Sequence, residues 1–191
     1  MEMQDIIENM FYKDPNLPPI LVTKTEGAYW HDNYGRKILD VSGGPMAINI
    51  GHGRKEVAEA AKQVLEQTSY VLPVFASEAR IELTKRIKKM VPPELNRIYY
   101  ASGGSEANEV AVKFARQYQV VSGRDSKYKV ISRKLSYHGN TLATLSFGDI
   151  PTRRADYIPM LWDTPHIEPC YCYRCPFGKE YPGCDIECAR A

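Results

Sequence analysis

Apolar residues recur at helical spacing in three parts of the chain. They repeat every three or four positions in residues 54–68, 77–90 and 106–121, which is typical of helices that turn one face toward a core. Ser77 is a candidate N-cap for the second helix, and Gly123 is a stop signal behind the third. The third helix has the most regular apolar face, made of Ala107, Val110, Ala111, Phe114, Ala115 and Tyr118.

Short alternating stretches predict strands. Residues 21–24, 28–31 and 36–40 alternate in polarity, and the residues before the third stretch have turn chemistry, so we expect a hairpin here. Residues 97–101 and 129–132 read as strands on either side of the third helix. Strand, helix and strand together form a βαβ unit, which predicts an α/β fold with a parallel sheet.

The composition narrows the class of protein. The chain has 191 residues, 43% hydrophobic and 25% charged, with a formal net charge of +2. These values fit a globular protein and argue against a dedicated nucleic-acid binder. No apolar run is long enough to span a membrane, and residues 1–20 read as an amphipathic lead and a proline-rich linker rather than a secretory signal. We therefore expect a cytoplasmic protein without nucleic-acid or membrane partners.

The stretch Tyr-Tyr-Ala-Ser-Gly-Gly-Ser-Glu at residues 99–106 lies between a predicted strand and a predicted helix. At a helix N-terminus the first N–H groups lack intrahelical acceptors, so they can bind an anion. Glycines allow a phosphate to approach the backbone, and the hydroxyl groups of Ser102 or Ser105 could add a donor. When these residues are taken alone, an ordinary helix cap is the interpretation that we favour.

A second candidate site follows the next predicted strand, at residues 136–141, Ser-Tyr-His-Gly-Asn-Thr. Ligands of open α/β sheets bind at the loops that follow the strands. Tyr137 could stack on a flat heterocycle, and His138 could donate or accept a hydrogen bond. A core tyrosine and a satisfied histidine are the alternative. Together the two loops would suit a phosphorylated aromatic cofactor.

These motifs occur in the order and spacing of a known family. From about residue 30 to 148 the chain resembles the class III aminotransferases, which depend on pyridoxal 5′-phosphate (PLP). The matching stretches are residues 34–40, 51–54, 100–109 with Lys113, Ala115 and Arg116 beyond them, and 137–141. The resemblance implies an α/β fold: part of the large domain of the aspartate-aminotransferase type (PLP fold type I), preceded by an N-terminal α+β segment.

The resemblance also implies domains and residue roles. Residues 1–70 would form the N-terminal segment, a hairpin plus a helix, and residues 71–191 the first part of the PLP-binding domain. The backbone N–H groups of Gly104 and Ser105 would hold the cofactor phosphate, and Tyr137 would stack on its ring. The whole implied cofactor set is Ser102, Gly103, Gly104, Ser105, Tyr137, His138 and Gly139, and the implied substrate set is Ser42, Gly43, Met46 and Asn140. The site would be completed at a homodimer interface.

The implied reaction is transamination from an amino acid, ω-amino acid or amine to a keto acid such as pyruvate. An aminomutase or lyase with the same cofactor site is the alternative. The family's Schiff-base lysine and the aspartate that pairs with the pyridine nitrogen both lie downstream of the Tyr-His-Gly motif. None of Lys113, Lys134 and Lys179 matches that lysine. We therefore interpret the chain as the front part of a longer enzyme and expect it to be inactive alone.

Asn140 is informative about the amino donor. Family members that bind an α-carboxylate in this loop have an arginine after His-Gly, whereas this chain has Asn140. The resemblance thus favours the branch that takes ω-amino acids or amines and passes nitrogen to pyruvate. Met46 stands where that branch often has a large aromatic residue, so taurine, β-alanine, a diamine or a simple amine all remain open as donors.

All five cysteines lie in one short segment: Cys170, Cys172, Cys175, Cys184 and Cys188. Their spacing could hold a structural zinc ion, which makes a zinc-binding interaction module the rival hypothesis from another class. Reduced thiols that pack within a surface loop are the other interpretation, and the one that we favour for a reducing cytoplasm.

Overall fold

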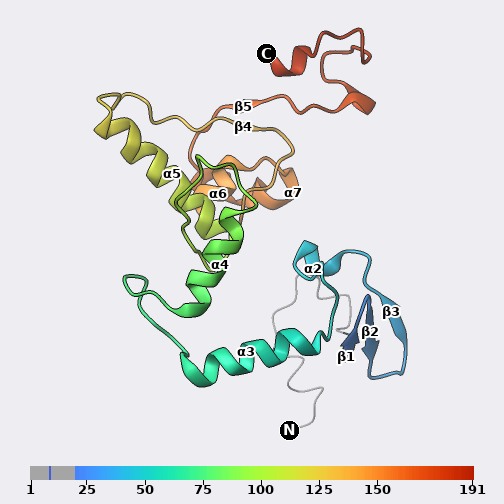
Figure 1. The fold of residues 1–191 in the computed structure, drawn as a ribbon. Coiled ribbons are helices and arrows are strands. Elements are labelled where there is room, and N and C mark those ends of the chain that lie inside the picture. The colour runs from blue at the N-terminus through green and yellow to red at the C-terminus, as the bar shows by residue number, and fades with distance from the viewer. Residues whose placement is uncertain (1–8, 10–19) are drawn as a thin grey trace. The chain divides into compact units, whose positions relative to one another are not determined.

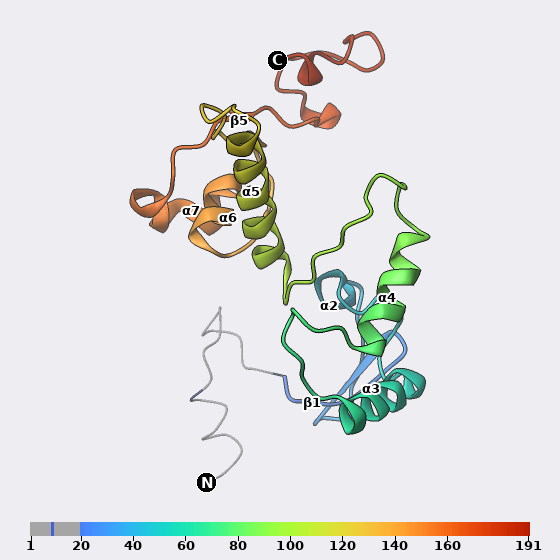
Figure 2. The same ribbon diagram turned by 60° about the vertical axis from the view of Figure 1, so that its left-hand side comes forward.

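The computed structural model describes residue 9 and residues 20–191. The chain forms two compact units, Met1–Asn96 and Arg97–Ala191 (Figures 1 and 2). The predicted boundary between residues 70 and 71 concerns the domains of a longer enzyme and stays a prediction. The predicted lead and linker of residues 1–20 lie almost wholly outside the described residues.

The first unit contains the predicted hairpin as a three-stranded antiparallel sheet. Its strands are β1 (Val22–Glu26), β2 (Tyr29–Asp32) and β3 (Lys37–Leu39), in that order. Glu26 pairs with Tyr29 across the tight first turn, and Trp30 pairs with Ile38. The alternating pattern therefore predicted these strands correctly to within two residues at each end.

A buried carboxylate holds the second turn of this sheet. Asp32 accepts hydrogen bonds from the backbone N–H groups of Tyr34 (3.0 Å) and Arg36 (2.8 Å), and from Arg36 Nε (2.5 Å). Burial raises the pKa of Asp32, but these hydrogen bonds outweigh burial and lower the pKa below its ordinary value. In this turn, the charged carboxylate accepts the backbone N–H groups that would otherwise lack a hydrogen-bond partner from a neighbouring strand.

Three helices follow in the first unit: α2 (Gly43–Met46), α3 (Lys55–Gln67) and α4 (Glu78–Lys88). α3 and α4 confirm the helices predicted for residues 54–68 and 77–90. The predicted cap is also confirmed, because the Ser77 hydroxyl accepts the N–H of Arg80. Neither helix has a buried residue, so the other described residues cover their apolar faces only in part.

The second unit is organised around α5 (Gly104–Val121) and α6 (Leu142–Phe147), which lie against each other (Figures 1 and 2). α5 confirms the third predicted helix, begins two residues earlier than predicted, and ends just before Gly123, which has a φ of +71°. The remaining elements are short: β4 (Ser132–Arg133), α7 (Pro151–Arg154), η1 (Ala155–Met160), β5 (His166–Ile167), η2 (Cys172–Arg174) and η3 (Glu187–Ala189).

The parallel sheet is much smaller than predicted. Residues 97–101 do not form a strand, so that prediction is wrong for this structure, and the strand predicted at 129–132 coincides with β4 only at Ser132. A strand is stabilised by hydrogen bonds to a neighbouring strand, and no strand of the described residues lies beside 97–101. β4 pairs in parallel with β5, which the sequence pattern did not reveal.

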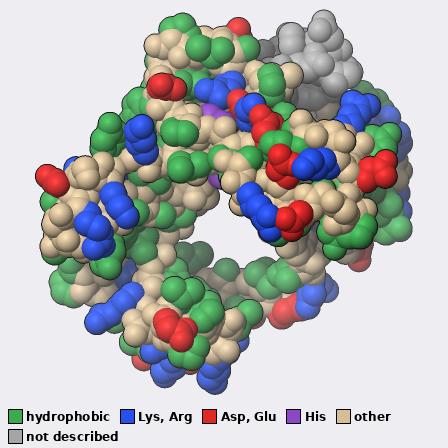
Figure 3. Space-filling model, turned by 90° about the horizontal axis from the view of Figure 1, so that it is seen from above, with side chains coloured by type: hydrophobic (Ala, Val, Ile, Leu, Met, Phe, Trp, Pro, Cys, Tyr) green, Lys and Arg blue, Asp and Glu red, His purple; other side chains and the backbone are tan. Residues whose placement is uncertain are grey.

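Little of the described chain is buried. The buried hydrophobic side chains are Ala143 and Phe147, both on α6, where Phe147 packs edge-to-face with Trp162. The apolar face of α5 stays accessible: Phe114 is 57% exposed and Tyr118 64%. On the face seen in Figure 3, hydrophobic side chains lie at the surface among interspersed basic and acidic ones. No helix of the described residues is long and apolar enough to cross a membrane.

Replacement of Asp32 tests the role of its carboxylate. We expect Asp32→Ala to lower the denaturant midpoint of the first unit, because three hydrogen-bond donors lose their acceptor. Glu66→Ala is a matched control, since Glu66 is an exposed carboxylate in the same unit, and its midpoint should stay unchanged.

The same carboxylate predicts a pH dependence with a defined sign. Because folding lowers the pKa of Asp32, its contribution to stability is full above the ordinary carboxyl pKa and disappears as the pH falls through the lowered value. The difference between the wild-type chain and Asp32→Asn should therefore shrink in acid. A difference that grows toward low pH would contradict this role.

Candidate functional site

The N-terminus of α5 begins without a side-chain cap. Gly103 is the N-cap residue, has extended backbone angles, and makes no side-chain cap hydrogen bond. The N–H of Ser102 donates to Glu106 Oε2 (2.7 Å), so this donor already has an acceptor within the protein. A Cβ atom at Gly103 or Gly104 would meet open space. The space beside these two glycines is therefore open, and the first N–H groups of a helix can bind an anion that approaches there.

The loop of residues 137–141 lies against this first turn. The N–H of Asn140 donates to Ser105 Oγ (3.0 Å), and Asn108 Nδ2 donates to the carbonyl oxygen of His138 (2.7 Å). Thr141 Oγ1 donates to Glu109 Oε1 (2.5 Å). The structure therefore brings the two motifs of the sequence together, although about thirty residues separate them.

Sequence reasoning missed the positioning roles of Asn108, Glu109 and Thr141. A usable signal was present, because Ser105, Asn108 and Glu109 stand at positions i, i+3 and i+4 of one helix and therefore share a face. A polar stripe on an otherwise apolar helix indicates that another polar segment docks there. The pattern alone does not say which segment that is.

Gly139 is the closest contact between the loop and the helix. Its φ is +139°, and a Cβ atom there would lie 2.4 Å from Ser105 Oγ and 2.6 Å from Thr144 Oγ1. Both distances are far below van der Waals contact, and one neighbour belongs to α5 and the other to α6. Only glycine fits between the two helices without displacing one of them.

A capping box fixes the far end of the loop. The N–H of Thr141 donates to Thr144 Oγ1 (3.1 Å), and the N–H of Thr144 donates weakly to Thr141 Oγ1 (3.3 Å). Thr144 is fully buried. The loop is therefore held by α5 at one side and by the buried start of α6 at the other.

Tyr137 stands at the open side of the loop. Its side chain is 52% exposed, its hydroxyl donates to Asn140 Oδ1 (3.2 Å), and the Arg153 guanidinium carbon lies 4.8 Å from the ring centroid. The cation covers part of the ring, and about half of the side chain remains accessible. An accessible aromatic ring beside a helix N-terminus can stack on a planar ligand.

His138 carries a buried polar atom without a partner. Its Nε2 has no hydrogen-bond partner, although the carbonyl oxygen of the same residue is held by Asn108. Buried polar atoms are nearly always hydrogen-bonded in folded proteins. This unpartnered nitrogen makes His138 a candidate for contact with a ligand.

The remaining predicted substrate residues lie in the first unit. Asp40 Oδ1 accepts the N–H of Ser42 (3.1 Å), the hydroxyl of Ser42 (3.1 Å) and the N–H of Gly43 (2.9 Å). Met46 follows on α2 and is 80% exposed. The structure thus groups Asn140 with the predicted cofactor residues and places Ser42, Gly43 and Met46 in the other compact unit.

Asp40 is itself fixed by a histidine. His52 Nε2 lies 2.9 Å from Asp40 Oδ2, and Trp30 Nε1 points at the same nitrogen from 3.1 Å. In a neutral ring this nitrogen either donates to Asp40 or accepts from Trp30, so the two hydrogen bonds exclude each other. The hydrogen bond from His52, then those from Ser42 and Gly43, lower the pKa of Asp40 against the effect of burial.

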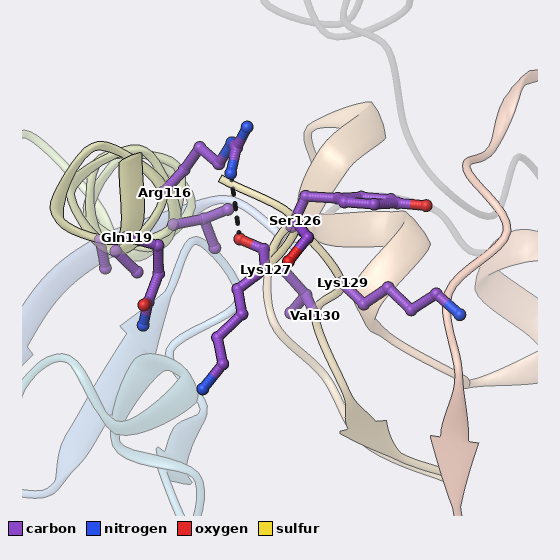
Figure 4. A pocket seen from close by; sticks show the side chains of 10 residues that line it. Arg116, Gln119, Ser126, Lys127, Lys129 and Val130 are labelled. Carbon is purple, nitrogen blue, oxygen red and sulfur yellow. Dashed lines mark hydrogen bonds between the residues drawn. The ribbon is translucent and has the colours of Figure 1, made fainter. Parts of the chain in front are cut away.

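A cavity of about 900 Å³ lies between α5 and residues 126–130 (Figure 4). Arg116 crosses its edge and donates to the carbonyl oxygens of Asp125 (2.6 Å) and Lys127 (3.2 Å). None of the predicted cofactor residues lines this cavity. The candidate site is therefore an open helix N-terminus with its adjoining loop, and the cavity lies elsewhere on α5.

The described residues, which include every cysteine, contain no group of three or more histidine, cysteine or acidic side chains arranged to hold a metal ion. All five cysteines are free thiols.

Comparison with known proteins identifies the fold and the family. A family model described as "Aminotransferase class-III" matches residues 11–184. The uncharacterized aminotransferase YhxA of Bacillus subtilis is 40% identical over 158 residues, which are 82% of this chain and 35% of YhxA. The putrescine–pyruvate aminotransferase of Pseudomonas aeruginosa is 33% identical over 150 residues, 71% of this chain and 33% of that enzyme.

A solved structure extends the likeness to three dimensions. The PLP-bound amine transaminase of an uncultivated Pseudomonas species superposes with a TM-score of 0.82 and 27% identity, over 95% of this chain and 42% of that one. The two compact units thus match part of a PLP-dependent transaminase of fold type I, as the fold prediction stated. The chain spans about a third of the length of the two curated relatives.

PLP is the cofactor of this family, and both of the predicted cofactor motifs lie within the matched residues. Since the family model covers well over half of the sequence and the fold agrees with it, the chain belongs to the class III aminotransferases.

Proposed function

We propose that the protein that carries this chain is a PLP-dependent transaminase, in which this chain supplies the phosphate-binding and ring-stacking part of the cofactor site. The single observation that carries the proposal is the contact of residues 137–141 with the first turn of α5. That contact supports the proposal because it joins the N-terminus of α5, whose first N–H groups can bind an anion, to the loop that carries an accessible tyrosine and an unpartnered histidine nitrogen.

The residues at the site fit PLP. Its phosphate suits the helix N-terminus at Gly104 and Ser105, where two glycines leave space for close approach. Ser105 Oγ accepts the N–H of Asn140 and keeps its own proton for donation to a phosphate oxygen. When bound, the cofactor supplies the electron-accepting ring through which the amino group is transferred.

Tyr137 and His138 would hold the ring of the cofactor. Tyr137 is about half exposed, and its hydroxyl group is fixed by Asn140. His138 Nε2 would gain the hydrogen-bond partner that it lacks. Both side chains would orient the ring and exclude water from one side of it.

We propose an amine or ω-amino acid as donor and a keto acid such as pyruvate as acceptor. Asn140 cannot bind a carboxylate as the bidentate arginine of other family members does. The name of the 33%-identical relative, a putrescine–pyruvate aminotransferase, supports an amine donor and pyruvate. Ser42, Gly43 and Met46 would line the substrate path, with Ser42 and Gly43 held in place by Asp40.

We also propose a cytoplasmic homodimer, as the resemblance implies. Exposed apolar side chains on α3, such as Val57, Val64 and Leu65, support a surface that another part of the assembly covers. The five free thiols agree with a reducing compartment.

Product analysis tests the proposed function. The protein that carries this chain, purified and supplied with PLP, should form alanine from pyruvate and a diamine or simple amine, and should not do so without the cofactor. In the same sample, the amount of alanine formed should equal the amount of amine consumed. Rearranged or eliminated products without alanine would instead indicate an aminomutase or lyase.

Replacement of Tyr137 tests the stacking role. We expect Tyr137→Ala to weaken PLP retention by about 1–3 kcal/mol, roughly 5- to 150-fold in Kd, because the ring loses an aromatic neighbour. Tyr173→Ala is the matched control, since Tyr173 also lies under an arginine, Arg174, at 5.7 Å but belongs to the cysteine-rich loop. If both variants retained PLP equally well, Tyr137 would not be part of the cofactor site.

Replacement of Gly139 tests the geometry of the loop. A methyl group at this position collides with Ser105 and Thr144, so Gly139→Ala should displace the loop from α5 and weaken PLP binding at least as much as Tyr137→Ala. Gly123→Ala is the control, because a Cβ atom there meets open space although φ is also positive. Spectrophotometric titration with PLP measures both, and normal binding by Gly139→Ala would contradict the docked loop.

A further inference from the structure

Residues 51–54, Gly-His-Gly-Arg, are among the stretches that carry the resemblance, and the proposed function gives them no role. In the structure this stretch is fixed against the turn between β1 and β2. The N–H of Gly27 donates to the carbonyl oxygen of His52 (3.0 Å), and the N–H of His52 donates to the carbonyl oxygen of Gly27 (2.7 Å). The backbone of His52 is therefore held at the end of the hairpin.

The two glycines of this stretch permit the close approach. Gly51 has a φ of +86° and Gly53 a φ of +67°, and a Cβ atom at Gly53 would lie 2.8 Å from the carbonyl oxygen of Thr25. Glycine adopts these angles at little cost and has no side chain that would collide. The pattern Gly-His-Gly thus places a single large side chain, the imidazole of His52, beside the sheet.

This imidazole lies between an acceptor and a donor. His52 Nε2 is 2.9 Å from Asp40 Oδ2 and 3.1 Å from Trp30 Nε1, and the side chain of Asp40 is only 3% exposed. An indole N–H can only donate, and an ionised carboxylate can only accept. Because a hydrogen bond to a charged acceptor is the stronger of the two, Nε2 donates to Asp40. Trp30 then packs edge-to-face on the ring, with centroids 6.3 Å apart.

The carboxylate of Asp40 connects this histidine to the predicted substrate segment, residues 42–46. Its Oδ2 atom faces His52, while its Oδ1 atom accepts the N–H groups of Ser42 and Gly43 and the hydroxyl of Ser42. A hydrogen bond to one oxygen fixes the rotation of the carboxylate and therefore aims the other oxygen. The His52 hydrogen bond is also the largest influence that lowers the pKa of Asp40.

The segment needs such an anchor. Met46 has a φ of +64°, which residues other than glycine rarely adopt, and its side chain is exposed. Backbone of this kind keeps its conformation only where neighbouring contacts hold it. We propose that His52 is a positioning residue that acts through Asp40 to fix residues 42–46 for the substrate. The substrate part of this inference rests on the proposed function.

Hydrogen exchange, followed by mass spectrometry on the protein that carries this chain, tests the connection without any need for activity. In His52→Ala the amides of Ser42 and Gly43 should exchange roughly tenfold faster, because Asp40 loses the donor that orients it, and a hydrogen bond to a charged group contributes about that factor. Exchange at the wild-type rate would overturn the proposal.

The turn held by Asp32 is the matched control within the same unit. Asp32 accepts the amides of Tyr34 and Arg36, and its side-chain donor is Arg36 Nε. These two amides should exchange equally fast in His52→Ala and in the wild type. If they also exchange faster, the unit has unfolded, and His52→Gln decides. Its side-chain amide keeps a donor, so slow exchange should return, and continued fast exchange would count against the proposal.

Trp30→Phe separates the two hydrogen bonds of the imidazole. Phenylalanine keeps the aromatic packing and removes the indole N–H. If His52 donates to Asp40, the amides of residues 42 and 43 should stay as slow as in the wild type. Acceleration as large as in His52→Ala would mean that Trp30 orients the segment instead, and the role of His52 would be refuted.

Kinetics test the substrate part. His52→Ala should raise KM for the amine donor several-fold with little change in kcat or in the Kd of PLP, and adding it to Asp40→Ala should raise KM no further, since the histidine acts through Asp40. Faster exchange with an unchanged KM would overturn the substrate role. Absence of alanine formation by the wild-type protein would contradict the proposed function instead, and the exchange result would still decide whether His52 fixes the segment.

Discussion

The candidate site depends on the close approach of Gly139 to the first turn of α5. At this point the loop backbone passes between Ser105 on one helix and Thr144 on another, with no room for a side chain. The hydrogen bonds of Asn140, His138 and Thr141 to α5 all lie within two residues of this contact. If the loop stood farther away, the helix end would bind anions without an aromatic ring beside it.

Polar contacts, rather than a large apolar core, hold this region together. Among the described residues the buried hydrophobic side chains are Ala143 and Phe147, while Thr144 and Ser146 are completely buried in the same short helix. Ser146 accepts the N–H of Trp162, and Thr144 completes the capping box. Each buried hydroxyl group is satisfied, so burial of these polar groups fixes one geometry without a large desolvation cost.

The first unit uses the same principle with carboxylates. Asp32 gathers the donors of a strand turn, and Asp40 gathers those of the glycine-rich segment at Ser42 and Gly43. In both cases hydrogen bonds keep the pKa below its ordinary value despite burial. A single charged acceptor thus orders backbone that has no helix or sheet partner of its own.

Local patterns in the sequence determined the helices α3, α4 and α5 and the antiparallel hairpin, because helical and hairpin hydrogen bonds join residues that are close in the chain. The order of the motifs also determined the family. Tertiary structure decided the rest. Residues 97–101 have strand-like composition but no partner strand among the described residues, and β5 became visible only through its pairing with β4. The contact of Tyr137–Thr141 with Ser105–Glu109 joins residues that are about thirty positions apart in the sequence, and such a contact leaves no periodic signal from which a pattern could predict it.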